Sequence, residues 1–230
     1  MNATIPAGSG LDEETARAEI YGLLAQLYYA PPSPQLLAAI RVAVTEAPAQ
    51  GAFLEEPWRA VVAVSRDMGD RAIADEYDAL FGGVGKPEVY LFGSHYLSGF
   101  LNEKPLARLR DTLAELGLGR DEAMGETEDH ISYVCEVMRY LIAGDDVAVA
   151  NLTKQREFFA EHVQPWVSDC CDAIAAHPKA LFYAVLANFS RLSSASKRKA
   201  STCSPEPAVR GQTQGPEQKL SSRGLTRDPA

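Results

Sequence analysis

The stretch ETEDHISYVCEVM, residues 126–138, joins an acidic cluster with one histidine to an apolar pattern of helical period. From Ile131 to Met138 the apolar residues recur at spacings of three and four, which predicts one buried face of an α-helix. Thr127 is the predicted N-cap, and the acidic residues after it would lie in the first turn, where the helix dipole favours negative charge. The stretch therefore predicts a buried helix whose amino-terminal end carries ionisable groups.

The same period runs along most of the chain, and no segment alternates long enough to predict a strand. Further helices are predicted near residues 12–30, 34–47, 57–65, 73–81, 97–101, 106–116, 152–163, 166–174 and 181–192. The pattern indicates a single all-α domain of about nine to ten helices over residues 11–192, after a flexible N-terminus at residues 1–10. Residues 117–125 hold three glycines among charged residues and are the predicted hinge.

Charge is spread unevenly along the chain. Residues 1–192 carry 15 basic and 28 acidic side chains, a net charge of −13, whereas the whole chain has −9. Such a surface disfavours nucleic acid and anionic lipid as partners and favours basic peptides or proteins. From Ser193 the composition changes to Ser, Lys, Arg, Gln, Pro and Gly, so residues 193–230 are predicted to be a disordered tail. A reading-frame change or a cloning artefact would produce this abrupt boundary, and no function is assigned to the tail.

Targeting and redox signals favour a cytoplasmic protein. The N-terminus has no positive region followed by an apolar run, so no signal peptide is predicted. No segment approaches the roughly 20 apolar residues of a membrane span, so no stable membrane insertion is expected. The four cysteines, Cys135, Cys170, Cys171 and Cys203, have no CxxC spacing, which favours neither a disulfide framework nor a zinc site.

The ionisable residues also allow an enzymatic interpretation. Asp129 and His130 could form an acid/base couple, which gives a helical metal-dependent hydrolase as the alternative function. The sequence indicates no nucleophile and contains no recurrent spacing of metal ligands. No catalytic residue, metal or cofactor is therefore predicted. The segment GGVGK at residues 82–86 lacks the flanking residues of a phosphate-binding loop. A ligand-sensing domain of a regulator would call for a basic recognition helix, and none is present.

Two motifs together resemble a known family. Residues 76–81, EYDALF, resemble the Tyr-x-x-Leu-Phe signature, and residues 126–131, ETEDHI, resemble the Glu-Pro-x-Asp-His signature, of the TorD/DmsD family of redox-enzyme maturation chaperones. The resemblance covers roughly residues 11–192. Thr127 stands where the family has proline, and the loop after the first signature departs from the usual proline-rich form. That loop looks closer to a branch associated with formate dehydrogenases.

The resemblance implies a chaperone without catalysis of its own. It would bind the catalytic subunit of a molybdopterin-dependent oxidoreductase, or that subunit's N-terminal, often twin-arginine, signal peptide, until the cofactor is inserted. The sequence is compatible with a monomer and with a hinge-exchanged homodimer. Carboxylates could pair with the arginines while an apolar wall takes the rest of the peptide. The implied client-binding residues are Tyr77, Leu80, Phe81, Glu126, Glu128, Asp129 and His130.

Overall fold

In the computed structural model, the described residues are 10–43, 54–82, 86–120 and 124–201. They form α1 (Gly10–Tyr29), α2 (Pro34–Arg41), α3 (Glu55–Asp67), α4 (Asp70–Leu80), α5 (Gly93–Ser98), α6 (Lys104–Glu115), α7 (Ile131–Ala143), α8 (Leu152–Phe158), the π-helical turn η1 (Phe159–Val163), α9 (Val167–Ala175) and α10 (Phe182–Ser201). No β-strand occurs within these ranges, which contain one isolated antiparallel bridge, between Phe92 and His130. The predicted all-α fold is confirmed. None of the helices in these ranges is long and apolar enough to cross a membrane.

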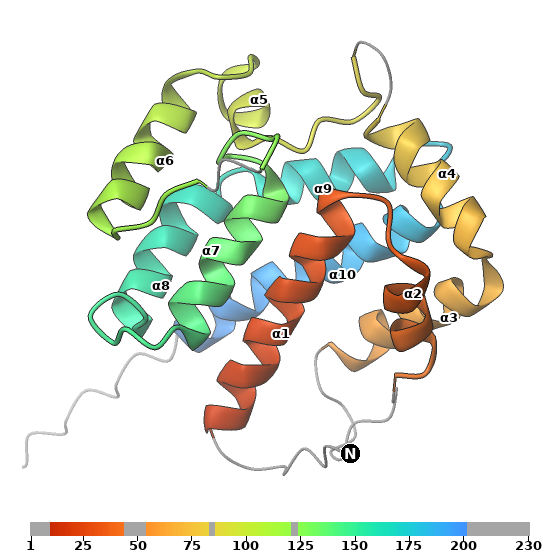
Figure 1. The fold of residues 1–230 in the computed structure, drawn as a ribbon, viewed down its shortest axis with the longest axis horizontal. Coiled ribbons are helices and arrows are strands. Elements are labelled where there is room, and N and C mark those ends of the chain that lie inside the picture. The colour runs from red at the N-terminus through yellow and green to blue at the C-terminus, as the bar shows by residue number, and fades with distance from the viewer. Residues whose placement is uncertain (1–9, 44–53, 83–85, 121–123, 202–230) are drawn as a thin grey trace, which may run out of the picture.

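Helices α1, α7 and α10 form the centre of the molecule. Figure 1 shows α1 running beside α7, with α10 behind them and the shorter helices around this group. α1 packs most extensively against α7, and α10 packs against α9 and α3. A Cβ added at Gly22 of α1 would lie 2.9 Å from Cδ of Arg139 on α7, so glycine allows the two helices to approach closely here. The predicted apolar face of α7 is buried in this contact.

The carbonyl end of α1 is closed by two tyrosine hydroxyl groups from other helices. Tyr183 Oη donates to the main-chain oxygen of Leu27 at 3.0 Å, and Tyr77 Oη donates to that of Tyr28 at 3.1 Å. The last carbonyl groups of a helix have no partner within the helix, so these hydroxyl groups satisfy atoms that would otherwise be buried unpaired. The two bonds fix α4 and α10 against the end of α1.

Several helix boundaries differ from the predictions. The helix predicted near residues 34–47 ends at Arg41, with Val42 as its C-cap. Phe100 and Leu101, predicted to be helical, follow the end of α5, because Gly99 adopts the left-handed conformation at φ 80° and ends that helix. α10 continues to Ser201, past the predicted boundary at residue 193. Alanine, lysine and arginine in this segment are good helix formers, which accounts for the continuation. The remaining predicted tail, the N-terminus through residue 9, and residues 121–123 of the predicted hinge lie outside the described residues.

Candidate functional site

The first signature, on α4 and its C-cap, contains both buried and partly exposed residues. Leu80 is fully buried and Tyr77 is 9% exposed, whereas Phe81, the C-cap of the helix, is partly exposed. The main-chain oxygen of Leu80 accepts a hydrogen bond from Val89 N at 3.0 Å, so the chain after α4 returns to the helix end. Leu80 therefore contributes to the core, and Phe81 presents the largest surface of the three.

Phe81 is held by a cluster of tyrosine rings. Its ring centroid lies 5.2 Å from that of Tyr77 and 5.0 Å from that of Tyr183, both in edge-to-face geometry. Tyr28 makes a third edge contact at 6.5 Å. Such pairs contribute on the order of 1 kcal/mol each beyond the area they bury. Phe81 is consequently the partly exposed member of an aromatic cluster formed by residues of α1, α4 and α10.

Glu76, next to Tyr77, was not predicted as a site residue and has a defined structural role. Its buried carboxylate accepts hydrogen bonds from the main-chain N–H groups of Leu181, Phe182 and Tyr183, at 2.8, 3.1 and 2.8 Å. These groups begin α10, where a helix has unpaired donors and favours negative charge. Glu76 therefore caps α10 from α4 and sets the position of Tyr183 in the aromatic cluster.

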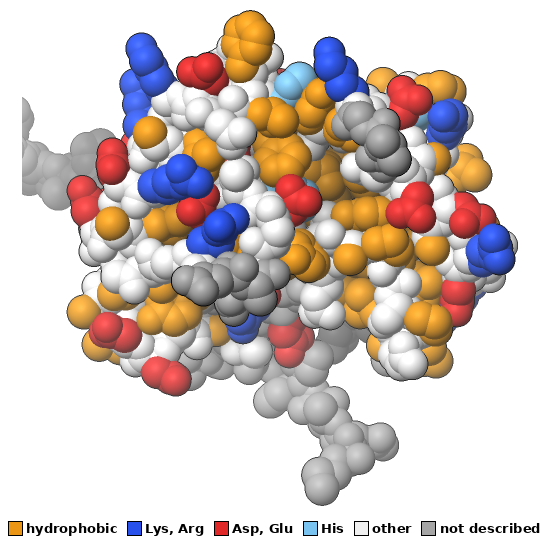
Figure 2. All heavy atoms as spheres, turned by 45° about the horizontal axis from the view of Figure 1, so that its top comes forward, with side chains coloured by type: hydrophobic (Ala, Val, Ile, Leu, Met, Phe, Trp, Pro, Cys, Tyr) orange, Lys and Arg blue, Asp and Glu red, His pale blue; other side chains and the backbone are white. Residues whose placement is uncertain are grey.

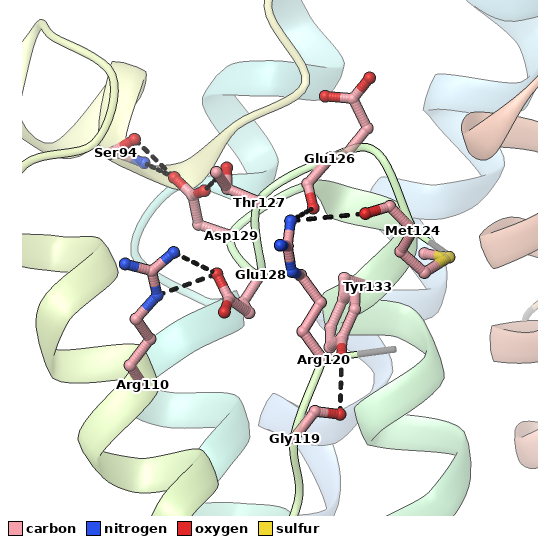
Figure 3. A network of polar contacts seen from close by, with 10 residues as sticks. All are labelled: Ser94, Arg110, Gly119, Arg120, Met124, Glu126, Thr127, Glu128, Asp129 and Tyr133. Carbon is pink, nitrogen blue, oxygen red and sulfur yellow. Dashed lines mark hydrogen bonds and ion pairs between the residues drawn. The ribbon is translucent and has the colours of Figure 1, made fainter. Parts of the chain in front are cut away.

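The second signature forms a hydrogen-bonded turn before α7. His130 N donates to the main-chain oxygen of Thr127 at 3.0 Å. The Asp129 carboxylate accepts hydrogen bonds from Ser94 N at 2.8 Å, Ser94 Oγ at 2.5 Å and Thr127 Oγ1 at 2.6 Å. Figure 3 shows Ser94 and Thr127 converging on this carboxylate from different segments. Asp129 is 4% exposed, so its carboxylate is a buried junction within the protein.

This turn also holds residues 88–94, a segment between the two signatures in sequence, which we call the strap. Ile131 N donates to the main-chain oxygen of Leu91 at 2.8 Å, and Gly93 N donates to that of Asp129 at 2.9 Å. A Cβ added at Gly93 would lie 3.0 Å from the Trp166 indole ring, so a side chain would push the strap away from η1 and α9. The apolar strap thereby satisfies main-chain groups that would be costly to bury unpaired.

His130, and not Thr127, is the N-cap of α7. Its Nδ1 accepts a hydrogen bond from Ser132 N at 3.3 Å, and its ring lies 5.0 Å from the Phe92 ring. Thr127 was predicted for this role, but its hydroxyl group donates to Asp129 instead. Burial lowers the pKa of His130 to about 4, against the opposing influence of the Asp129 charge, because the imidazolium form loses its hydration. His130 is therefore neutral at neutral pH.

Glu128 is paired with a cation of α6. Arg110 donates from Nε at 3.0 Å and from Nη2 at 2.8 Å to the same carboxylate oxygen, Oε2. Burial would raise the pKa of Glu128, but the hydrogen bonds and charge of Arg110 outweigh it and hold that pKa below its ordinary value. The guanidinium is about half exposed, so water screens the pair.

The Glu128→Gln variant is expected to lose less than about 1 kcal/mol of unfolding free energy at pH 7, because one partner is solvent-exposed. A carboxylate with a lowered pKa stabilises the fold above its unfolded pKa of about 4.3, and this contribution is lost as the pH falls through the folded pKa. Urea titrations of wild type and variant should therefore converge in acid. Arg110→Gln should show the same loss, and the double variant no more than either alone. A difference between wild type and Glu128→Gln that does not change with pH would contradict this assignment.

Glu126 differs from the other acidic residues of the turn because it is exposed. Its main-chain oxygen accepts from Arg120 Nη1 at 3.3 Å, while Figure 3 shows its carboxylate directed away from the Asp129 and Glu128 groups. The pKa of the Tyr77 hydroxyl is raised, chiefly by burial and further by the negative charges of Glu126 and Asp78. The Glu126 carboxylate therefore lies within electrostatic range of the α4 signature.

The structure thus divides the predicted residues into two groups. An inner group is buried and bonded within the protein: Tyr77, Leu80, Glu128, Asp129 and His130. An outer group, Phe81 and Glu126, retains accessible surface. Among the described residues, no three His, Cys, Asp or Glu side chains are grouped as metal ligands, and Cys135, Cys170 and Cys171 are buried free thiols.

The nitrate reductase delta subunit family has a sequence model that matches residues 48–172, more than half of the chain. The chain belongs to the nitrate reductase delta subunit family. This family is TorD-like and its members are redox enzyme maturation chaperones, which confirms the predicted resemblance. The matched region of the delta subunit family contains both signatures, the strap and η1, but ends before α10.

A solved structure supports the fold assignment within this family. A candidate redox enzyme maturation protein from Archaeoglobus fulgidus is 18% identical in sequence and superposes with a TM-score of 0.51. The alignment covers 83% of this chain and 97% of that one. At this identity the likeness concerns the fold alone. A comparison with curated proteins gives no match.

Proposed function

We propose that this delta subunit family member is a cytoplasmic, non-catalytic chaperone for a molybdopterin-dependent oxidoreductase. It binds the N-terminal, often twin-arginine, signal region of the catalytic subunit and assists cofactor insertion and assembly before export. The observation that carries the proposal is the outer group: the exposed part of Phe81 on a rigid aromatic cluster, within electrostatic range of the exposed Glu126.

The outer group offers one apolar and one acidic side chain with accessible surface. Figure 2 brings the upper end of the molecule forward and shows hydrophobic side chains gathered near its centre, with acidic and basic side chains around them. A signal peptide presents cationic residues followed by an apolar run. Arginine binds carboxylate and stacks on aromatic faces, so Glu126 and Phe81 offer complementary contacts. The net charge of −13 over residues 1–192 favours encounter with such a peptide.

The inner group has a supporting role in this proposal. Tyr77 and Leu80 hold Phe81 in place, while Glu128, Asp129 and His130 hold the turn that carries Glu126. The strap is bonded both to the end of α4 and to the turn before α7, and in this proposal it sets client preference. The family description names nitrate reductase, whereas the form of the strap favours the formate dehydrogenase branch, and the proposal includes both enzymes as clients.

The proposal is tested by titrating wild type and variants with a synthetic peptide of two adjacent arginines followed by about fifteen apolar residues. Glu126→Gln is expected to weaken binding about fivefold, the effect of one partly exposed ion pair on the order of 1 kcal/mol. Phe81→Ala is expected to weaken it at least tenfold, because a fixed aromatic anchor is lost. Isothermal titration calorimetry gives both values.

Glu19→Gln removes an exposed carboxylate on α1 and should bind the peptide like wild type. A peptide with both arginines replaced by glutamine should lose affinity for wild type but show little difference between wild type and Glu126→Gln. Equal affinities of wild type, Glu126→Gln and Phe81→Ala would refute the assigned surface. A stoichiometric transition metal in the purified protein would instead favour the metal-dependent hydrolase with Asp129 and His130.

A further inference from the structure

The end of α5 and the turn after it expose a group of apolar side chains. Eight large hydrophobic side chains are exposed in the described part of the chain, and three of them, Leu97, Phe100 and Leu101, lie within five consecutive positions. Phe100 is 70% exposed, and the two leucines are 43% and 40% exposed. Single apolar side chains on a surface need no explanation, but a group of them at one place is typical of an interaction surface. We call these three residues the α5 patch.

The main chain that carries the α5 patch is ordered. Gly99 N donates to the main-chain oxygen of His95 at 2.9 Å, and Gly99 turns the chain at φ 80°. Tyr96 holds α5 against the protein, because its ring stacks on that of Trp166 with centroids 6.0 Å apart. Its hydroxyl group donates to the main-chain oxygen of Tyr90 at 2.8 Å. Binding at a surface that is already ordered costs little conformational entropy.

The α5 patch lies in an uncharged segment beside an acidic turn. Residues 89–102, VYLFGSHYLSGFLN, contain no Asp, Glu, Lys or Arg. Ser94, at the start of α5, is bonded to Asp129, which belongs to the same turn as the exposed Glu126, as Figure 3 shows. A helix rises about 1.5 Å per residue, so Leu97 lies about 5 Å along α5 from Ser94. An exposed carboxylate and an uncharged apolar surface therefore occupy connected segments.

This distribution of charge matches that of a signal peptide, which presents cationic residues followed by an apolar run. A run of about fifteen apolar residues is about 22 Å long as a helix, which is more than the ring of Phe81 can cover. We propose that the α5 patch is a docking surface for the apolar run of the client signal peptide, while Glu126 binds its cationic residues. This inference rests on the proposed function and adds to it a second subsite outside both signatures.

The charge and the size of the α5 patch argue against two other occupants. Attraction to an anionic membrane requires basic side chains, and residues 89–102 have neither Lys nor Arg. A stable dimer with a second copy of this chain would bury about 800 Å² per partner, far more than three side chains offer. A short apolar segment of a partner requires neither basic side chains nor a large area.

The double variant Leu97→Gln/Phe100→Gln tests the proposal with the peptide of two arginines and about fifteen apolar residues. Both side chains are exposed, so the urea midpoint should stay close to that of wild type. The affinity for the peptide, measured by isothermal titration calorimetry, is expected to fall about tenfold. Val147→Gln is the matched control and should bind like wild type, because Val147 is 80% exposed and follows the opposite end of α7.

A second peptide keeps the two arginines and has serine throughout the former apolar run. Wild type should bind this peptide more weakly than the first one, and the double variant should bind it as wild type does. An equal loss of affinity for both peptides in the double variant would overturn the inference, because the lost contact would not be with the apolar run.

Methyl NMR of wild type supplies a measurement that does not depend on the stability of any variant. The methyl resonances of Leu97 and Leu101 should shift when the first peptide is added, whereas those of Val147 should not. Unshifted leucine methyl groups, or a double variant that binds the first peptide as tightly as wild type does, would overturn the inference and leave the proposed function standing. Failure of wild type to bind the first peptide would instead refute the proposed function, and the inference with it.

Discussion

Glu76→Ala is expected to lower the free energy of unfolding by on the order of 4 kcal/mol, because three main-chain donors at the start of α10 would lose their acceptor. Each unsatisfied buried donor costs roughly 1–3 kcal/mol, and water entering the site would recover part of that cost. Urea denaturation followed by circular dichroism measures the loss. The near-ultraviolet signal of Tyr183 and Tyr77 should weaken with it, since Glu76 positions the tyrosine cluster.

Neighbouring substitutions provide the controls for this prediction. Glu76→Gln keeps one acceptor oxygen but places an amide N–H group against a main-chain donor, so roughly half the loss is expected. Asp75→Ala removes an exposed carboxylate one residue earlier on α4 and should change stability by less than about 0.5 kcal/mol. A Glu76→Ala protein as stable as Asp75→Ala would show that water replaces the cap.

Asp129→Ala should be the second most damaging change, with an expected loss of about 3 kcal/mol. The substitution leaves Ser94 N, Ser94 Oγ and Thr127 Oγ1 without their common acceptor. It should also free the strap, which is held at the same turn. Hydrogen exchange should therefore accelerate at the amides of Gly93 and Ser94, while the amides in the middle of α1 and α7 change only as far as global stability falls.

The measurements of stability and hydrogen exchange distinguish a structural role for Asp129 from direct client contact. Asp129→Asn retains one oxygen toward Ser94 and should lose roughly half as much stability as Asp129→Ala. Asp111→Ala, which removes an exposed carboxylate of α6, is the matched control and should leave exchange in the strap unchanged. If Asp129→Ala abolished peptide binding while stability and exchange at Ser94 stayed as in wild type, Asp129 would be a client ligand.

Helical periodicity predicted most elements of the fold because the spacing of apolar residues is local information. It placed α7 and α6 correctly. It placed Phe100 in a helix because the pattern does not show where the chain turns, and Phe100 is 70% exposed after Gly99 ends α5. Gly99 itself was the available signal for that end.

The roles of the acidic residues could not be predicted from periodicity. Asp129 meets Ser94 from 35 residues away, and Glu128 meets Arg110 from 18 residues away, so each carboxylate is occupied by a partner that local sequence does not indicate. Glu76 was recognisable in one respect. It falls between Ile73 and Leu80 at helical spacing, on the apolar face of α4, and a charged residue there requires a buried partner.

The partners of the inner group have a consequence for how new client specificities can arise. Glu76, Tyr77 and His130 bond to main-chain atoms, which every amino acid supplies, so the scaffold depends little on which side chains surround it. Phe81 and Glu126 belong to no such bond through their side chains. Under the proposed function, a substitution at Glu126 would therefore alter recognition at little thermodynamic cost, whereas one at Phe81 would also lose its ring contacts with the tyrosine cluster. Duplicated copies of this fold could diverge toward different enzymes, through the acidic position first, while the same internal framework is inherited intact.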